Sequence, residues 1–168
     1  MTKAEQPMLN IQPLRGNHDR SRFESGSGQL DLWLRQTAQQ HQKRGISKTF
    51  VAIADDDPSR ILGFYALTAC EAVSQELPGD LAKRLPRNVP GIRIGRLAVD
   101  RSVQGQGLGE LLLMNAIDRS RRVLEDVGVH ALFVDAKDAN AAAFYRKYGF
   151  RPLPEQPLQL VLVLAGLS

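Results

Sequence analysis

The stretch that decides the fold of this chain is RLAVDRSVQGQGLGE, residues 96–110. It reads as a strand, a glycine-rich turn and the first residues of a helix. Glycines let backbone N–H groups converge on an anion with no Cβ in the way, and a helix N-terminus adds unpaired donors and a favourable dipole. We therefore expect residues 104–109 to form a pyrophosphate-binding turn.

Two familiar phosphate-binding motifs do not fit this turn. A Rossmann fingerprint that began at Gly105 would need glycine at position 110, where the chain has Glu110. A P-loop would end in Gly-Lys-Ser or Gly-Lys-Thr, and neither follows these glycines. The pattern that remains is Gln104-x-x-Gly107-x-Gly109, which on its own also fits a tight connection between a strand and a helix.

On both sides of the turn, apolar residues recur with the periods of strands and helices. Towards the C-terminus the pattern predicts a helix, a strand, a helix and a strand, at Leu108–Val127, Ala131–Val134, Ala139–Tyr148 and Leu158–Leu164. The periodic residues that form one face of the first of these helices are Leu108, Leu111, Leu112, Ala116, Ile117, Ser120, Leu124 and Val127. Towards the N-terminus it predicts strands at Leu9–Leu14, Thr49–Ala54, Ile61–Cys70 and Ile92–Val99, a helix at Gln29–Arg44, and a long loop at Glu71–Pro90 with one helical turn at Asp80–Arg84. This alternation of strands and helices favours an α/β layered fold.

A second segment, NAAAFYRKYGF at residues 140–150, joins an asparagine to a helix that ends in Phe-Tyr-x-x-x-Gly-Phe. Together with the glycine turn, it resembles the GNAT acyltransferases over most of the chain, from Thr49 to the last strand. The resemblance implies a GNAT fold, with a mixed central sheet and flanking helices, in one domain spanning residues 1–168. It also implies a splayed pair of parallel strands, Ile92–Val99 and Ala131–Asp135, that receives the pantetheine arm of acetyl-CoA.

The same resemblance implies a role for each matching residue. The cofactor-binding residues would be Leu97, Ala98, Val99, Gln104, Gly105, Gln106, Gly107, Leu108, Gly109, Glu110, Asn140 and Phe144. Main-chain groups of Leu97 and Val99 would hold the pantetheine and polarise the thioester carbonyl, while the turn would hold the pyrophosphate. Tyr145 would be the catalytic general acid, since a phenol with a pKa of about 10 stays protonated at neutral pH. The alternative for Tyr145 is an aromatic residue that packs under the sheet.

Direct attack by an amine on acetyl-CoA is the expected reaction. The sequence has no evident Ser-His-Asp or Cys-His constellation that would support a covalent enzyme intermediate. His18, His41 and His130 lack the spacing of metal ligands, so no metal site is expected.

Further segments make the resemblance more specific within the GNAT family. They are FESGSGQLDLWL at residues 23–34, KTFV at 48–51, GFYAL at 63–67, GRLAVD at 95–100 and a Pro-Leu-Gln-Leu that ends at Leu160. With them, the chain resembles the GNAT toxins of type II toxin–antitoxin systems along nearly its whole length. This implies acetylation of the α-amine of aminoacyl-tRNA, which blocks translation. It also implies a cognate ribbon-helix-helix antitoxin as partner and a homodimer.

Positive charge gathers around the glycine turn. The chain carries +4 overall, but residues 83–122 hold nine basic residues against three acidic ones. Of these, we expect Lys83, Arg84, Arg87, Arg93 and Arg96 to contact the phosphates of tRNA, with the strong salt dependence of such contacts. The alternative is that these basic residues do not bind tRNA. Some would lie on a solvent-exposed helix face, and others would bind only the phosphates of CoA.

The composition also bears on location and on other functions. Cys70 is the single cysteine, which excludes an intrachain disulfide framework and suits a reducing cytoplasm. Residues 1–10 lack the apolar core of a signal peptide, and the longest apolar run, Leu158–Leu167, is interrupted by Gln159 and Gly166, so no membrane association is expected. Two other functions remain open: an acetyltransferase for protein N-termini or small amines, and a non-catalytic regulatory module that binds acyl-CoA.

Overall fold

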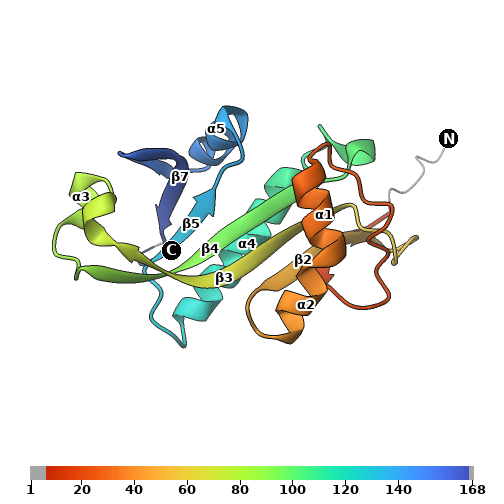
Figure 1. Ribbon diagram of the computed structural model, residues 1–168, viewed down its shortest axis with the longest axis horizontal. Coiled ribbons are helices and arrows are strands. Elements are labelled where there is room, and N and C mark those ends of the chain that lie inside the picture. The colour runs from red at the N-terminus through yellow and green to blue at the C-terminus, as the bar shows by residue number, and fades with distance from the viewer. Residues whose placement is uncertain (1–6, 167–168) are drawn as a thin grey trace. The chain divides into compact units, whose positions relative to one another are not determined.

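Seven strands form one sheet in the order β1-β2-β3-β4-β5-β7-β6 in the computed structural model, which describes residues 7–166 (Figure 1). The strands are β1 (Leu9–Pro13), β2 (Lys48–Ala54), β3 (Gly63–Val73), β4 (Asn88–Val99), β5 (Ala131–Asp135), β6 (Arg151–Leu153) and β7 (Gln156–Val163). The helices are α1 (Gly28–Gln36), α2 (Ala38–Lys43), α3 (Gly79–Ala82), α4 (Leu108–Leu124) and α5 (Ala139–Lys147), with 3₁₀ turns at Ser74–Glu76 and Arg101–Val103. Strands β4 and β5 run parallel, while the pairs β1–β2, β5–β7 and β6–β7 run antiparallel. The predicted mixed α/β fold is therefore confirmed.

The described residues fall into two compact units. The N-terminal unit comprises residues 7–66 and 96–115, and the C-terminal unit comprises residues 67–95 and 116–166. Strands β3 and β4 and helix α4 each contribute one part to each unit. Two segments from the sequence analysis extend beyond the described residues. Residues 1–6 of the segment 1–10 lie outside them, and so does Leu167, the last residue of the apolar run Leu158–Leu167.

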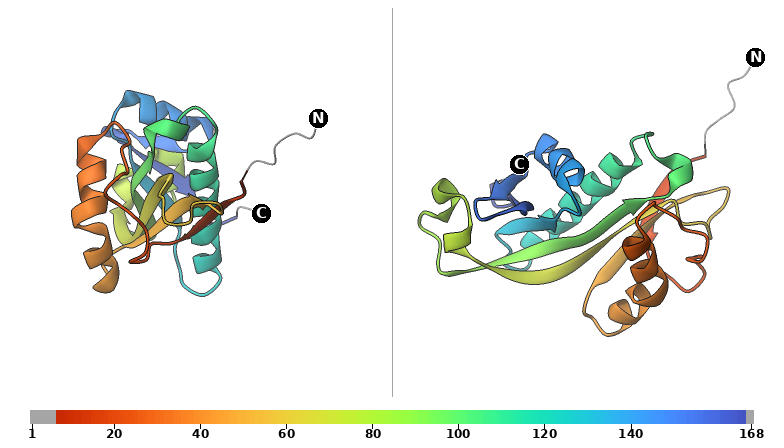
Figure 2. Two further views of the ribbon diagram at one scale, coloured as in Figure 1. Left: turned by 90° about the vertical axis from the view of Figure 1, so that its right-hand side faces the viewer. Right: turned by 45° about the horizontal axis from the view of Figure 1, so that its top comes forward.

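In the N-terminal unit, successive residues of β3 face opposite sides of the sheet. Phe64 stacks on Trp33 of α1 with 6.1 Å between ring centroids, and it meets Phe23 edge-to-face at 5.4 Å. Its neighbour Gly63 faces α4, where a Cβ would come within 2.8 Å of Leu112. Helices α1 and α2 therefore cover one face of these strands, and the first part of α4 covers the other, as Figure 2 shows.

The prediction of a single helix at Gln29–Arg44 is wrong, because the chain breaks at Thr37. Thr37 has φ −121° and ψ −36°, outside the helical region, and it separates α1 from α2. Its N–H donates to the Trp33 carbonyl and its carbonyl accepts from the His41 N–H, so α2 follows α1 directly. The apolar residues keep their helical spacing across the break, so periodicity alone did not reveal it.

In the C-terminal unit, β4 and β5 pair from Gly91↔Ala131 to Ile94↔Val134. Glycine is required at position 91, because a Cβ there would lie 2.6 Å from the Phe133 ring and 2.8 Å from the Ala131 carbonyl oxygen. Buried apolar side chains from β5, β6, β7 and the segment before α3 pack together in this unit: Leu77, Ala131, Phe133, Leu153 and Val161, with the partly buried Cys70 and Ala72 of β3 at the edge. Strand β4 continues past the last registered pair to Val99.

Two further element predictions are corrected in this unit. The loop predicted at Glu71–Pro90 is shorter, because β3 continues to Val73 and β4 begins at Asn88. Pro90 lacks an N–H, but its carbonyl accepts a 2.8 Å hydrogen bond from His130, so this proline does not end the strand. Strand β6 is absent from the sequence prediction, because its three residues are too few to carry a periodic pattern.

Helix α4 ends at Leu124 rather than at the predicted Val127, which is 59% exposed. Leu111 was also predicted on the buried face and is 50% exposed, whereas Leu112 beside it is fully buried. Leu113 is also fully buried, so the buried face of α4 is centred between Leu112 and Leu113. Because consecutive helical residues point about 100° apart, Leu111 lies well to one side of that face. Gly63 of β3 leaves the room that Leu112 occupies.

Candidate active site

The predicted anion-binding turn lies in the N-terminal unit, between β4 and α4. Asp100 caps the 3₁₀ turn after β4, and Gly105 and Gly107 follow with φ of +78° and +85°. Residues with a Cβ rarely adopt this left-handed conformation. A Cβ at either glycine would meet no described atom within 4 Å, so the turn is open, and the 17-residue helix α4 begins at Leu108. Converging backbone N–H groups at a helix N-terminus can bind a phosphate group.

A buried carboxylate, Asp100, ties this turn to the segment before α1. Its Oδ1 accepts a hydrogen bond from the Glu24 N–H at 2.9 Å, and its Oδ2 accepts from the Ser102 N–H at 3.1 Å and the Ser102 hydroxyl at 2.6 Å. Burial by itself raises the pKa of this carboxyl, but the hydrogen bonds from Ser102 and Glu24 and the charge of Arg60 outweigh it and hold the pKa below its usual range. Asp100 is therefore ionised at neutral pH.

Gln104 is a second link between the same two segments. Its side-chain amide donates to the Ser25 carbonyl at 2.7 Å and to the Val99 carbonyl at 2.9 Å. The Arg101 N–H adds a hydrogen bond of 2.8 Å to the Glu24 carbonyl. Because the Gln104 amide is engaged, the donors that this turn can offer to an anion are its backbone N–H groups. Sequence reasoning missed this link, since no local pattern indicates a contact between residues 79 apart.

Ser25 is held in turn by Asp31 of α1. The Ser25 N–H lies 3.1 Å from both carboxylate oxygens, and the Ser25 hydroxyl donates to Oδ1 at 2.6 Å. Ser27 caps α1 by accepting from the Leu30 N–H at 3.4 Å. These bonds satisfy a carboxylate that is only 5% exposed. A chain of hydrogen bonds thus runs from α1 through Ser25 and Gln104 to the end of β4.

The last residues of β4 alternate between the core and a half-buried position. Ala98 belongs to the buried core, whereas Leu97 and Val99 are half-buried. Arg96 lies with its guanidinium carbon 4.3 Å from the centroid of the Trp33 ring, a cation–π contact. This contact places the Arg96 side chain against α1, and its predicted role in tRNA binding stays a prediction.

Tyr145, the predicted general acid, lies on α5 in the C-terminal unit. It is 5% exposed, and its ring meets Phe144 at 5.2 Å and Phe150 at 5.7 Å, both edge-to-face. Burial, and to a lesser degree the charge of Asp135, raises the pKa of Tyr145 far above its usual range. The phenol is therefore protonated at neutral pH, and the same side chain packs under the strands.

Asn140, the other predicted cofactor contact on α5, is exposed in the first turn of this helix. Asp138 caps the helix by accepting a hydrogen bond from the Ala141 N–H at 2.9 Å. Phe144 lies on the same helix, half-buried between Tyr145 and Tyr148, with 5.2 Å between its ring centroid and each of theirs. Asn140 is thus open to a ligand, while Phe144 is mainly a packing residue.

Arg93, a predicted tRNA contact, is in an ion pair on the parallel strands. Its Nη1 lies 2.7 Å from Oδ1 of Asp135, and its guanidinium carbon lies 6.0 Å from the centroid of the Phe133 ring. Burial raises the pKa of the neighbouring Cys70 thiol, although Arg93 works in the opposite direction. The charge of Arg93 is therefore matched within the C-terminal unit, which weakens the case for a direct phosphate contact.

Lys83, Arg84 and Arg87, the remaining predicted tRNA contacts, are exposed between α3 and β4. Arg84 has φ +65°, and no other described residue with a Cβ has a positive φ. Asp80 at the start of α3 accepts two hydrogen bonds from Arg151 of β6, at 2.7 Å and 2.9 Å. This ion pair joins the segment that carries the three cations to β6.

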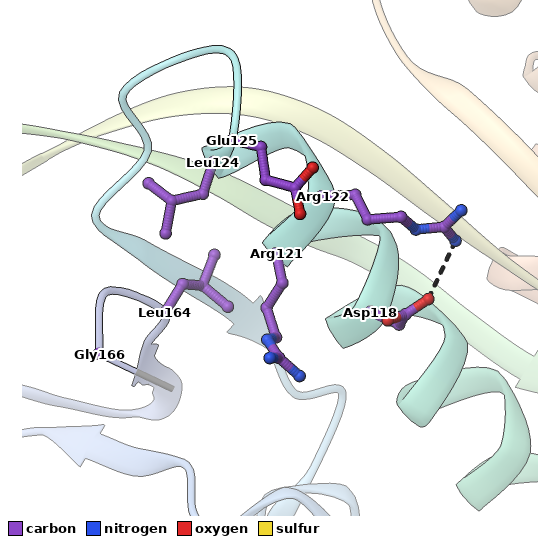
Figure 3. A pocket seen from close by; sticks show the side chains of 7 residues that line it. All are labelled: Asp118, Arg121, Arg122, Leu124, Glu125, Leu164 and Gly166. Atoms are coloured by element: carbon purple, nitrogen blue, oxygen red, sulfur yellow. Dashed lines mark ion pairs between the residues drawn. The ribbon is translucent and has the colours of Figure 1, made fainter. Parts of the chain in front are cut away.

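A hollow beside the second half of α4 holds charges of both signs (Figure 3). Asp118 and Arg122, both on α4, form an ion pair at 3.0 Å, and Glu125 adds a second carboxylate. Leu124 and Leu164 supply its apolar wall. Such a mixed lining does not favour an anionic ligand, and the hollow contains none of the predicted site residues.

Residues 7–166 contain no cluster of three or more His, Cys, Asp or Glu side chains that could hold a metal ion. Over the same residues, no helix combines the length and the apolar character that a membrane span needs.

A known family and a known protein match much of the sequence. The acetyltransferase (GNAT) domain family matches residues 45–152. A tRNA-acetylating toxin of Mycobacterium tuberculosis (strain ATCC 25618 / H37Rv) is 38% identical over 146 residues, which cover 87% of this chain and 86% of that protein.

Solved structures give a similar result. AtaT complexed with acetyl-methionyl-tRNAfMet superposes with a TM-score of 0.87 at 31% identity, covering 93% of this chain and 95% of that one. A tyrosine-to-phenylalanine mutant of the AtaT toxin, bound to the C-terminus of the antitoxin AtaR and to acetyl-CoA, superposes with a TM-score of 0.79 at 30% identity, covering 93% of each chain.

Proposed function

Because the chain belongs to the GNAT acetyltransferase family, we propose that it is a toxin that acetylates the α-amine of aminoacyl-tRNA and so inhibits translation. The observation that carries this proposal is its similarity, along most of its length, to a tRNA-acetylating toxin. The likeness to AtaT complexed with acetyl-methionyl-tRNAfMet supports the same class of substrate. Acetylation of protein N-termini or of small amines rests on the fold alone, which serves many acceptors.

The glycine turn suits the pyrophosphate of acetyl-CoA. Acetyl-CoA, when bound, supplies an acetyl group activated as a thioester. Two left-handed glycines leave an open backbone cradle at the start of α4, where the first N–H groups of the helix have no intrahelical partner. We assign the pyrophosphate to the backbone of residues 105–109, and the pantetheine to main-chain groups of Leu97 and Val99.

Tyr145 is the general acid in this proposal. A phenol whose pKa is raised by burial keeps its proton at neutral pH, as a group that protonates a departing thiolate must. Neither a side-chain nor a backbone hydrogen bond contributes to that pKa, so the proton is not committed to another described residue. The solved structure of a tyrosine-to-phenylalanine mutant of AtaT is consistent with a functional tyrosine in that toxin.

Direct attack by the amine is favoured over a covalent enzyme intermediate. Cys70 is the single cysteine of the chain, and burial raises the pKa of its thiol. A thiol that stays protonated is a poor nucleophile. The α-amine of the aminoacyl group, once neutral, is then the attacking group.

A cognate antitoxin, a homodimer and a cytoplasmic location complete the proposal. The structure of AtaT with the C-terminus of its antitoxin AtaR supports an antitoxin partner for this chain. We propose that the partner is a small ribbon-helix-helix protein, that residues 1–168 act as one catalytic domain, and that the chain acts as a homodimer where tRNA is charged.

Transfer of label from acetyl-CoA to tRNA tests this function. Charged, uncharged and chemically pre-acetylated tRNA are offered in parallel, with a short peptide and a polyamine as competing acceptors. We expect label on charged tRNA alone. Equal labelling of uncharged tRNA, or labelling of the peptide or polyamine with tRNA unmodified, would contradict the proposal.

Growth provides a second test. Expression of the chain without a partner should stop growth of the host, and Tyr145→Phe should relieve the arrest. Normal growth in the presence of folded, abundant wild-type protein would count against a toxin.

A further inference from the structure

Four basic side chains gather on the outer side of α1 and α2 in the N-terminal unit. Arg20, Arg35, Lys43 and Arg44 line one hollow, and the last three are exposed. None of the four is in an ion pair with another residue between 7 and 166. Their charge is therefore available to a partner.

Three glutamines, Gln36, Gln39 and Gln40, complete the lining of the hollow. Among the described residues, no carboxylate and no apolar side chain takes part in it. Amides and guanidinium groups donate hydrogen bonds to the phosphates and sugars of nucleic acids. Protein interfaces depend instead on buried aromatic or aliphatic anchors, which this hollow lacks.

The opposite side of the two helices is anchored to the rest of the N-terminal unit. Trp33, Leu34 and Ala38 are buried in the core of the unit. Gln42 donates to the Leu14 carbonyl at 2.7 Å and accepts from the Thr49 N–H at 3.0 Å, which holds α2 against β2. The outer residues of α1 and α2 are thus presented on helices that are anchored from below.

Residues 83–122 have the largest excess of positive charge in the sequence, but several of their basic side chains are paired with carboxylates in the structure. Arg93 pairs with Asp135 at 2.7 Å, Arg101 with Glu24 at 3.5 Å and Arg122 with Asp118 at 3.0 Å. These pairs reduce the field that residues 83–122 present. The four cations that line the hollow beside α1 and α2 lie outside that region of the sequence and are not matched by carboxylates among the described residues.

We propose that this surface, made of Arg20, Arg35, Gln36, Gln39, Gln40, Lys43 and Arg44 and called here the α1–α2 basic surface, binds the phosphate backbone of the tRNA substrate. The inference rests on the proposed function for the identity of the RNA. It deepens that function by assigning the substrate's backbone contacts to helices that precede the cofactor turn in sequence.

Neutralising three cations tests the surface. In the triple variant Arg35→Gln/Lys43→Gln/Arg44→Gln, binding of uncharged, unfractionated tRNA is measured between 50 and 200 mM salt. We expect binding at least about tenfold weaker, and a slope of log Kd against log salt that is smaller by about two to three, near one for each phosphate that the variant no longer neutralises. With charged tRNA, KM should rise while kcat changes little.

A matched control removes the same charges from elsewhere in the same unit. Arg15→Gln/Arg22→Gln/Lys48→Gln also loses two arginines and one lysine, all exposed and outside the hollow. We expect its tRNA binding to stay within about twofold of wild type. Acetyl-CoA binding and the thermal unfolding midpoint of both variants verify that they are folded.

Three results would overturn the proposal. Equal weakening in the two triple variants would mean that net charge, not this surface, attracts RNA. Unchanged tRNA binding in the α1–α2 variant would exclude the surface outright. Loss of binding to an acidic antitoxin peptide, with tRNA binding intact, would assign the surface to a protein partner.

Failure of this inference and failure of the proposed function give different results. If wild-type protein acetylates charged tRNA while the α1–α2 variant binds tRNA normally, only the surface is wrong. If wild-type protein fails to acetylate charged tRNA, yet the α1–α2 variant loses RNA binding, the proposed acetylation is wrong and the surface stands.

Discussion

The side-chain amide of Gln104 donates a hydrogen bond of 2.7 Å to the carbonyl of Ser25. The same amide donates to the Val99 carbonyl at 2.9 Å, so one side chain joins the end of β4, the glycine turn and the segment that leads into α1. Gln104 therefore acts as a positioning residue in our interpretation. It orients the turn whose backbone we assign to the pyrophosphate.

Replacing Gln104 with alanine should weaken acetyl-CoA binding by about fivefold or more. The variant loses two hydrogen bonds that orient the turn, and each contributes about 1 kcal/mol net. Calorimetric titration with acetyl-CoA measures the effect. Gln106→Ala, an exposed neighbour in the same turn, is the control and should bind acetyl-CoA nearly as wild type does. Equal losses in the two variants would remove the special role of Gln104.

Tyr145→Phe should lower turnover by about 100-fold or more and leave acetyl-CoA binding intact. The phenylalanine keeps the buried ring contacts with Phe144 and Phe150 but lacks the proton of the general acid. Single-turnover kinetics and acetyl-CoA titration separate the two effects. Tyr148→Phe, the same chemical change on the residue that caps α5, should keep most of the activity. Full activity in Tyr145→Phe would leave Tyr145 as a packing residue only.

Stability should fall as the pH drops through about 6.5, because His18 is buried as the neutral imidazole. Burial, aided by the charge of Arg15, lowers the pKa of His18. Its Nδ1 accepts the Arg15 N–H at 2.9 Å, and its Nε2 lies 3.1 Å from Oε1 of Gln12. As the pH falls, His18 is protonated in the unfolded chain before it is protonated in the folded chain. Its contribution to the free energy of unfolding is therefore present above the unfolded pKa and is lost at lower pH.

Denaturant unfolding of wild type and of His18→Gln between pH 5 and pH 8 measures this dependence. We expect the variant to be less stable at pH 8 and to lose less stability between pH 8 and pH 5. Parallel pH profiles for the two proteins would contradict the assignment to His18.

Gly91→Ala should reduce the free energy of unfolding by about 1–3 kcal/mol. The added Cβ would lie 2.6 Å from the Phe133 ring and 2.8 Å from a backbone oxygen, so the parallel strands must separate. The control is Gly95→Ala in the same strand, where a Cβ meets no described atom within 4 Å. Urea unfolding of the two variants should differ clearly, and equal midpoints would show that β4 and β5 adapt at this point.

Local signals account for what the sequence predicted well. The glycine turn at residues 104–109 and the segment at 140–150 are short and contiguous, and together they indicated the GNAT family, which the comparison confirms. Strand and helix periodicity gave the α/β fold class for the same reason. The predicted ends of the helices and strands were less accurate. Pro90 concealed the start of β4, and β6 is too short to show a pattern. Thr37 interrupts a helix without disturbing the spacing of its apolar residues.

By itself, the sequence determined the family, the class of cofactor and the residues for a candidate site, because short motifs carry these. Only the tertiary structure decided which charges are free and which side chains are already engaged. Arg93 meets Asp135, 42 residues away, and Gln104 meets Ser25, 79 residues away. Such pairs form when folding brings distant segments into hydrogen-bond range, and a count of charges along the chain does not contain that information. The basic surface consequently moved, in our inference, from residues 83–122 to the outer side of α1 and α2, where no carboxylate lies opposite the four cations among the described residues.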